Sequence, residues 1–273
     1  MKIALGKQHY IENFDFDKFI EEFNVKSYQE QRAFIESFDI STNPQWLDFK
    51  RGKLGASTAS KFLADSQKVS AMKRTKKYQE GTEKEKAFML AEIPLEEKLG
   101  ETCKELAYKI LAERRTKWSE PEANWSEKTS IKRGLIFEQF SSEIYEKLTG
   151  SKLVDVLFIE RNDLFGFSPD KLVVDDNKVC VEIKNFEPPA FYKAVSDMEK
   201  PETIAQIQMQ IWIGGLDRVD CIYTSFEDNT FKVIRHFRDE EYMKKFERRE
   251  KEFREYLDLL EEKLETEVID LKK

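Results

Sequence analysis

Histidine is scarce in this 273-residue sequence, which contains only His9 and His236. Zinc hydrolases, histidine-triad hydrolases and HNH-type nucleases need histidine as a metal ligand or as a base, so the shortage argues against all three classes. His236 lies in an apolar, strand-like run from Phe231 to Phe237, and we interpret it as structural. A hydrolytic centre in this chain would therefore depend on carboxylates.

Cysteine is also scarce, and long apolar runs are missing. The three cysteines, Cys103, Cys180 and Cys221, are odd in number and follow no ligand spacing, which fits reduced thiols and excludes a four-cysteine iron–sulfur cluster. The sequence has neither a signal peptide nor 18 consecutive apolar residues, so we expect a cytoplasmic protein without a membrane segment.

Positive charge is in overall deficit, since the net charge is −7, but it is unevenly distributed. Residues 1–49 carry a local charge of −4, whereas residues 50–77 hold nine basic side chains and one acidic side chain, a local charge of +8. A second basic group comprises Lys109, Arg114, Arg115 and Lys117. Either group could follow a phosphate backbone or simply form a solvated helical face.

Two short segments place carboxylates and an amine near one another. Ser168-Pro169-Asp170 and Glu182-Ile183-Lys184 lie in β-branched runs joined at Asp175-Asp176-Asn177, a pattern typical of a hairpin. Glu182 and Lys184 share one face of their strand because side chains alternate, and Asp170 can approach Glu182 from the partner strand.

This set of side chains suits metal-dependent hydrolysis of phosphodiesters. Mg²⁺ prefers oxygen ligands and keeps several waters, so Asp170, Glu182 and the Ile183 carbonyl would suffice to hold it. Lys184 could hold the attacking water or neutralise charge in the transition state. Glu-x-Lys alone is usually a solvated ion pair, but the alternating Val179, Val181 and Ile183 indicate a core strand.

Two predicted helices add polar residues. Thr203 to Ile213 carries Gln206 and Gln210 on one face and ends at two glycines. Ser130 to Gly150 carries Glu138 in its middle. Glutamate and glutamine in helices are more often surface residues than functional ones. Other predicted elements are helices at 57–64, 101–116, 189–198 and 240–265, strands at 153–160, 165–174, 179–183, 218–224 and 230–237, and a charged connection at 73–86.

In four blocks, taken in order, the sequence resembles the YqaJ-like viral recombinase group, the family of phage lambda exonuclease, on the PD-(D/E)XK nuclease fold. The blocks are Trp46 to Ser60, Gly134 to Glu138, the Ser168-Pro169-Asp170 and Glu182-Ile183-Lys184 pair, and Ala205 to Gln208. The likeness covers about residues 45 to 260. Lys171 stands where the family usually has glycine, and Gly55 replaces a common threonine.

The resemblance implies a role for each matching residue. Asp170, Glu182 and the Ile183 carbonyl would bind Mg²⁺, for which Mn²⁺ could substitute, and Lys184 would serve the nucleophilic water. Glu138 would assist at the metal, and Gln206 would support Lys184. Lys50 or Arg51, together with Ser57, would bind a 5′-phosphate, and the register leaves the choice between the two basic residues open.

We therefore expect an α/β protein with a PD-(D/E)XK core, a mixed central β-sheet flanked by helices, over residues 46–273, after a helical extension over residues 1–45. The resemblance implies Mg²⁺-dependent digestion of double-stranded DNA ends in the 5′ to 3′ direction, leaving 3′ single-stranded tails for a single-strand annealing protein in phage-type recombination. It also implies a homotrimer and a phage or prophage gene in a bacterial cell. The alternatives are an endonuclease of the same fold and a noncatalytic DNA-binding or host-inhibitor protein.

Overall fold

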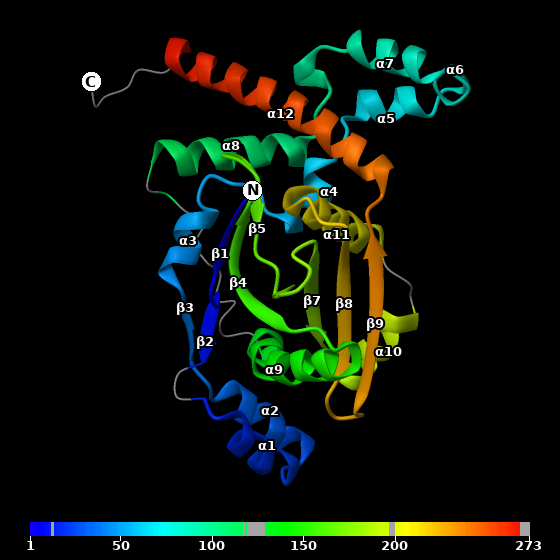
Figure 1. The fold of residues 1–273 in the computed structure, drawn as a ribbon. Coiled ribbons are helices and arrows are strands. Elements are labelled where there is room, and N and C mark those ends of the chain that lie inside the picture. The colour runs from blue at the N-terminus through cyan, green and yellow to red at the C-terminus, as the bar shows by residue number, and fades with distance from the viewer. Residues whose placement is uncertain (12–13, 117, 119–128, 197–199, 268–273) are drawn as a thin grey trace.

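A central mixed β-sheet organises the computed structural model, which describes residues 1–11, 14–116, 118, 129–196 and 200–267 (Figure 1). The sheet has seven strands in the order β1-β4-β6-β7-β8-β9, and β5 pairs with β4 beside this path. Only β7 and β8 are parallel, and the other pairs are antiparallel. The strands are β1 (Lys2–Leu5), β4 (Leu153–Glu160), β5 (Gly166–Phe167), β6 (Lys171–Val173), β7 (Val179–Asn185), β8 (Arg218–Ser225) and β9 (Thr230–Phe237).

Helices cover both faces of this sheet, as the sequence predicts. Alternate residues of β7 and β8 enter two separate apolar clusters: Val181 and Ile222 pack with Tyr145 of α9, whereas Cys180 and Cys221 join the main core. α9 crosses the lower end of the sheet and α11 its upper end in Figure 1. The helices nearest the sheet are α8 (Glu101–Arg115), α9 (Thr129–Thr149), α10 (Pro188–Ser196), α11 (Pro201–Gly214) and α12 (Glu240–Glu267).

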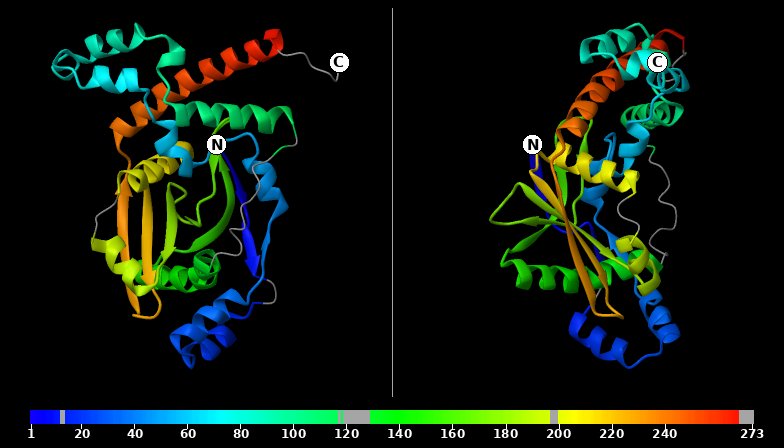
Figure 2. Two further views of the ribbon diagram at one scale, coloured as in Figure 1. Left: turned by 180° about the vertical axis from the view of Figure 1, so that it is seen from behind. Right: turned by 90° about the vertical axis from the view of Figure 1, so that its right-hand side faces the viewer.

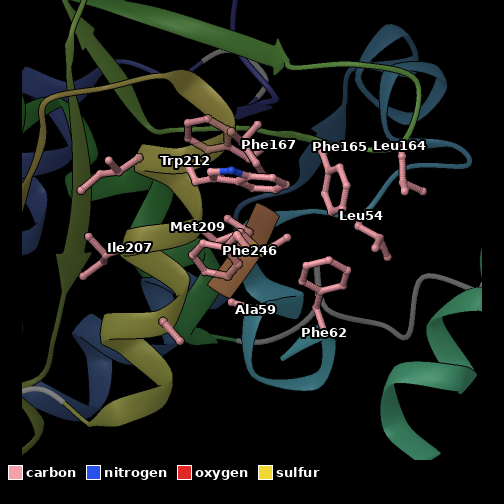
Figure 3. Packing of buried hydrophobic residues seen from close by; sticks show 14 of the residues in the cluster. Leu54, Ala59, Phe62, Leu164, Phe165, Phe167, Ile207, Met209, Trp212 and Phe246 are labelled. Atoms are coloured by element: carbon pink, nitrogen blue, oxygen red, sulfur yellow. The ribbon is translucent and has the colours of Figure 1, made fainter. Parts of the chain in front are cut away.

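The main core joins parts of the chain that are distant in sequence. Phe165 lies edge-on to Trp212 at 4.8 Å between ring centroids, and Trp212 stacks on Phe246 of α12 at 5.4 Å. Phe62 contacts Phe165 (Figure 3). It also contacts Phe253 of α12. Phe62 ends a short helical segment formed by η1 (Ala56–Thr58) and α4 (Ala59–Phe62). This packing fixes the segment after residue 52 against the sheet and α11.

The N-terminal segment contains two helices, but it also supplies strands. β1 forms an edge of the central sheet by pairing with β4, and β2 (His9–Ile11) pairs with β3 (Ile40–Thr42). Between them, α1 (Phe16–Asn24) and α2 (Tyr28–Glu36) pack Phe19, Phe23 and Ile35 against Phe137 of α9. α3 (Pro44–Lys50) follows. Division of the chain at residue 45 stays a prediction.

A helical arm projects beside α12 (Figures 1 and 2). It consists of α5 (Gln67–Lys73), α6 (Lys76–Gln79), α7 (Glu83–Ala91) and η2 (Leu95–Glu97) around a small cluster of Val69, Leu90 and Ile93. The expectation of a charged connection at 73–86 is therefore wrong. Ser66, Thr75 and Thr82 cap the N-termini of the three helices. These capping residues indicate helices in the sequence, but the high charge of the segment favoured the interpretation as a connection.

The predicted strand over 165–174 is interrupted in its middle. β5 ends at Phe167, and β6 begins at Lys171. Pro169 has no N–H to donate to a sheet, so the chain leaves the ladder there and places Asp170 at a strand end.

In the described part of the chain, no helix is both long enough and apolar enough to cross a lipid bilayer.

Candidate active site

Asp170 is held at the start of β6 by the neighbouring strand. Its Oδ2 accepts a hydrogen bond of 2.6 Å from the backbone N–H of Ile183 in β7. The antiparallel register pairs Lys171 with Val181, so Asp170 lies next to Glu182. The hairpin therefore brings together the two segments that the sequence singled out.

Glu182 is buried and is contacted from two sides. Lys184 Nζ donates to its Oε1 at 2.5 Å, and Gln210 Nε2 of α11 donates to its Oε2 at 2.9 Å. The Glu182 carboxylate raises the pKa of Lys184 above its ordinary value, although burial opposes this. Lys184 is therefore a stable ammonium group at neutral pH. Its side chain is 42% exposed, so it can reach a ligand from solvent.

The surroundings of Asp170, in contrast, disfavour the charged form of its side chain. Burial raises the pKa of its carboxyl well above the ordinary value, and the nearby carboxylates of Glu182 and Glu138 raise it further. A divalent cation beside Asp170 and Glu182 would relieve this repulsion, and carboxylate oxygens are the donors that Mg²⁺ prefers. The residues present thus fit a hard divalent ion. Within the described residues, however, no three acidic, histidine or cysteine side chains form a complete metal-binding cluster.

Glu138 approaches from α9 but is engaged by a lysine. Lys171 Nζ donates to Glu138 Oε1 at 2.5 Å and also to Asp155 Oδ1 of β4. Burial alone would lower the pKa of Lys171, but the Glu138 and Asp155 carboxylates outweigh it and raise the pKa. The role of Glu138 at a metal stays a prediction, and its observed partner is Lys171.

On α11, Gln210 rather than Gln206 contacts the site. Gln206 lies one turn earlier on the same helix face, is half-buried and makes no hydrogen bond to Lys184 among the described residues. Gln210 is buried, and its Oε1 has no partner in the described part of the chain. The spacing of four residues was visible in the sequence, but the choice between the two glutamines needed the structure.

Two early residues hold the turn before Asp170. Trp46 Nε1 donates to Ser168 Oγ at 2.6 Å, and Gln8 Nε2 donates to the Pro169 carbonyl at 2.9 Å. His9 lies edge-on to Trp46, and burial, followed by the charge of Lys50, lowers the pKa of His9 to about 4. His9 is therefore neutral at physiological pH. Sequence reasoning missed Gln8, whose neighbours give no motif.

Of the predicted phosphate-binding residues, Lys50 is linked to this turn by a side-chain contact. Lys50 Nζ sits 3.8 Å from the centroid of the Trp46 ring, whose N–H contacts Ser168. Arg51 pairs with Asp48 at 3.3 Å, and Ser57 is exposed in η1. The structure thus links Lys50 through Trp46 to the Asp170 turn, whereas Arg51 is directed to its own helix. The 5′-phosphate roles themselves stay predictions.

A cavity of about 450 Å³ adjoins Asp170 on the α9 side of the sheet. Its lining includes Gln8, His9, Glu138, Asp155, Asp170 and Lys171. Residues 6–11, which include β2, form one wall and α9 another, so the extension helps to shape the space beside the carboxylates.

The second basic group is largely used within the fold. Arg114 donates to the Gly52 carbonyl at 3.3 Å and pairs with Asp163, while Lys109 lies 3.9 Å from Glu113. Glu113 in turn accepts from the Gly52 N–H at 2.8 Å. Arg115 is exposed, and Lys117 lies outside the described residues. These contacts brace the segment from residue 52 rather than form a free cationic surface.

Comparison with known proteins supplies a family and related folds. The family model of the YqaJ-like viral recombinase domain matches residues 45–217. No curated protein sequence matches the chain. An alkaline exonuclease from Laribacter hongkongensis is similar in structure, with a TM-score of 0.55, 20% identity and coverage of 81% of this chain and 97% of that chain.

Two further structures share the fold. The same Laribacter enzyme in complex with dAMP gives a TM-score of 0.58 at 20% identity, covering 81% of this chain and 96% of that chain. A phage-related exonuclease from Haemophilus somnus gives 0.54 at 14% identity, covering 80% of this chain and 98% of that one. The mixed sheet flanked by helices is thus the fold of phage-type exonucleases.

Proposed function

Because the chain belongs to the YqaJ-like viral recombinase domain family, we propose that it is a Mg²⁺-dependent exonuclease acting on double-stranded DNA. It removes nucleotides in the 5′ to 3′ direction and leaves 3′ single-stranded tails for recombination. The observation that carries this proposal is the grouping of Asp170, bonded to Ile183, with the Glu182–Lys184 pair. The structural neighbours, which are exonucleases, support the same reaction class.

Each residue has a defined task in this reaction. Asp170, Glu182 and the Ile183 carbonyl would hold the divalent ion, and the Ile183 N–H and Gln210 orient the two carboxylates. When bound, Mg²⁺ polarises the scissile phosphate and lowers the pKa of water. Lys184 holds the attacking water and balances charge on the phosphate in the transition state. Glu138 assists from α9, and the supporting role predicted from sequence for Gln206 falls to Gln210, which contacts Glu182, the partner of Lys184.

DNA ends are the substrate in this proposal. Lys50, with Arg51 as the alternative, and Ser57 bind the 5′-phosphate; support comes from the contact of Lys50 with Trp46 beside the Asp170 turn. The partners are a single-strand annealing protein, which receives the tails, and two further copies of this chain in a trimer. We assign the enzyme to the cytoplasm of a bacterial cell that carries the phage or prophage gene.

Digestion of end-labelled linear duplexes with Mg²⁺, Mn²⁺ or EDTA tests the proposal. We expect metal-dependent release of nucleotides from 5′ ends, faster with a 5′-phosphate than with a 5′-hydroxyl, and resistance of covalently closed circles. Asp170→Asn and Lys184→Met should each lower the rate about a hundredfold or more. Lys50→Ala should reduce the preference for the 5′-phosphate.

Matched controls lie on the same hairpin. Asp175→Asn and Lys178→Met change the same types of charge at exposed positions and should leave the rate unchanged. Full activity of Asp170→Asn would refute the site. Rapid cutting of circles would favour the endonuclease alternative, and DNA binding without cutting would favour the noncatalytic one.

A further inference from the structure

Lys171 lies inside the candidate active site although the family resemblance places a glycine at this position. It directly follows Asp170, and the register of β4 and β6 places it opposite Asp155. Its side chain therefore leaves the sheet on the α9 face, where Glu138 is located. Only 8% of the residue is exposed, so its ammonium group is removed from most solvent.

Both partners of this ammonium group are acidic. Glu138 Oε1 lies 2.5 Å from Lys171 Nζ, and Asp155 Oδ1 accepts from the same nitrogen. A buried charge is stable only when it is paired and hydrogen-bonded, and removing one partner leaves the other uncompensated. The three side chains thus form one unit, in which Lys171 fixes the direction of the Glu138 carboxylate.

The charge balance of the site follows from this unit. Four carboxylates, of Glu138, Asp155, Asp170 and Glu182, face the two ammonium groups of Lys171 and Lys184. Metal binding requires Asp170 and Glu182 to be ionised, and the set then carries two net negative charges, which one divalent cation would neutralise. Without Lys171, Glu138 and Asp155 would be free to hold a second cation, as in two-metal sites where the ions lie about 4 Å apart.

We propose that Lys171 is a positioning residue that holds Glu138 against β4 and takes the place of a second metal ion, so that each chain binds one divalent cation. The inference rests on the proposed metal-dependent function. It accounts for the observed engagement of Glu138 by Lys171. Lys171 itself would contact neither the metal nor the scissile phosphate.

The test is the number of Mn²⁺ ions bound by the metal-free protein, measured from the electron paramagnetic resonance signal of free Mn²⁺ during titration. We expect one ion per chain for the wild type and two for Lys171→Met. Lys152→Met is the matched control, because it removes the same charge from an exposed residue beside β4, and it should bind one ion. The double variant Lys171→Met with Glu138→Gln should return to one.

The outcomes separate the inference from the function on which it rests. Two ions bound by the wild type, or one ion bound by both the wild type and a folded Lys171→Met, would overturn the role of Lys171 while leaving metal dependence intact. No Mn²⁺ binding by the wild type would overturn the metal-dependent function as well. Should Lys171→Met fail to melt cooperatively, the wild-type stoichiometry alone decides.

Discussion

At the scale of single residues, the orientation of the Glu182 carboxylate depends on two hydrogen-bond donors. Lys184 supplies an ammonium group and Gln210 supplies an amide N–H, so both carboxylate oxygens are fixed. In the proposed reaction Lys184 also serves the attacking water, whereas Gln210 only orients Glu182. The two contributions can therefore be separated by mutation of the glutamine.

Gln210→Leu should remove the neutral donor while keeping most of the side-chain volume. Removing one hydrogen bond from a buried carboxylate costs about 1 to 3 kcal/mol of free energy. If the full cost falls on the transition state, the rate drops roughly ten- to hundredfold. Initial rates and urea unfolding measure the two effects. Gln206→Leu, one turn earlier, is the comparison and should cause the smaller loss; the reverse order would contradict the geometry.

The sequence could identify Asp170, Glu182 and Lys184 as one group because alternation along a strand fixes which side chains share a face. It could not choose between Gln206 and Gln210. Residues four apart lie on the same face of a helix and are separated by a rise of about 6 Å along its axis. Which of the two glutamines reaches Glu182 therefore depends on how α11 docks on the sheet. It also gave no partner for Lys171, because Asp155 and Glu138 come from separate elements.

At the scale of elements, the turn between β5 and β6 is held by parts of the chain that precede it by more than a hundred residues. Trp46 of α3 and Gln8 before β2 each donate one hydrogen bond to it. The boundaries of β4 and β9 could be predicted, since both are continuous runs rich in β-branched, aromatic and other apolar residues. The break between β5 and β6 was missed because its flanking residues keep a strand-like pattern around Pro169.

Trp46→Phe tests the importance of this support. The substitution keeps an aromatic ring for Lys50 and His9 but removes the N–H that contacts Ser168. We expect a loss of about 1 kcal/mol in the free energy of unfolding, together with a lower kcat because Asp170 is less well positioned. Phe49→Leu, elsewhere on α3, should destabilise without the same fall in kcat. A fully active Trp46→Phe would show that the turn is held without this bond.

At the scale of the whole molecule, positive charge is concentrated in residues 50–77, which reach into the first half of the arm. Several of the arm's lysines are in ion pairs, such as Lys68 with Glu97 and Lys73 with Asp65. Arg74 and Lys77 are exposed near α6. The net charge of −7 therefore does not describe the surface that DNA would meet.

The double substitution Arg74→Ala with Lys77→Ala should weaken DNA binding. If both side chains contact phosphates, the slope of log K against log salt falls by about 2, because each contact contributes about 0.9. Fluorescence anisotropy of a short duplex in EDTA measures binding without cutting. Lys244→Ala with Lys251→Ala, which removes the same charge from exposed positions on α12, should leave the slope unchanged. Equal slopes for both double variants would exclude the arm from DNA contact.

The long sequence separation of the contacts at the Asp170 turn has a consequence for biosynthesis. Gln8 and Pro169 are 161 residues apart, and Trp46 and Ser168 are 122 apart. A ribosome translating this message therefore exposes the supporting side chains well before it has made the loop they support. Gln210, which orients Glu182, emerges later still. A polypeptide whose synthesis stops before this helix consequently lacks the contact that orients Glu182, so the candidate site is assembled only in longer chains.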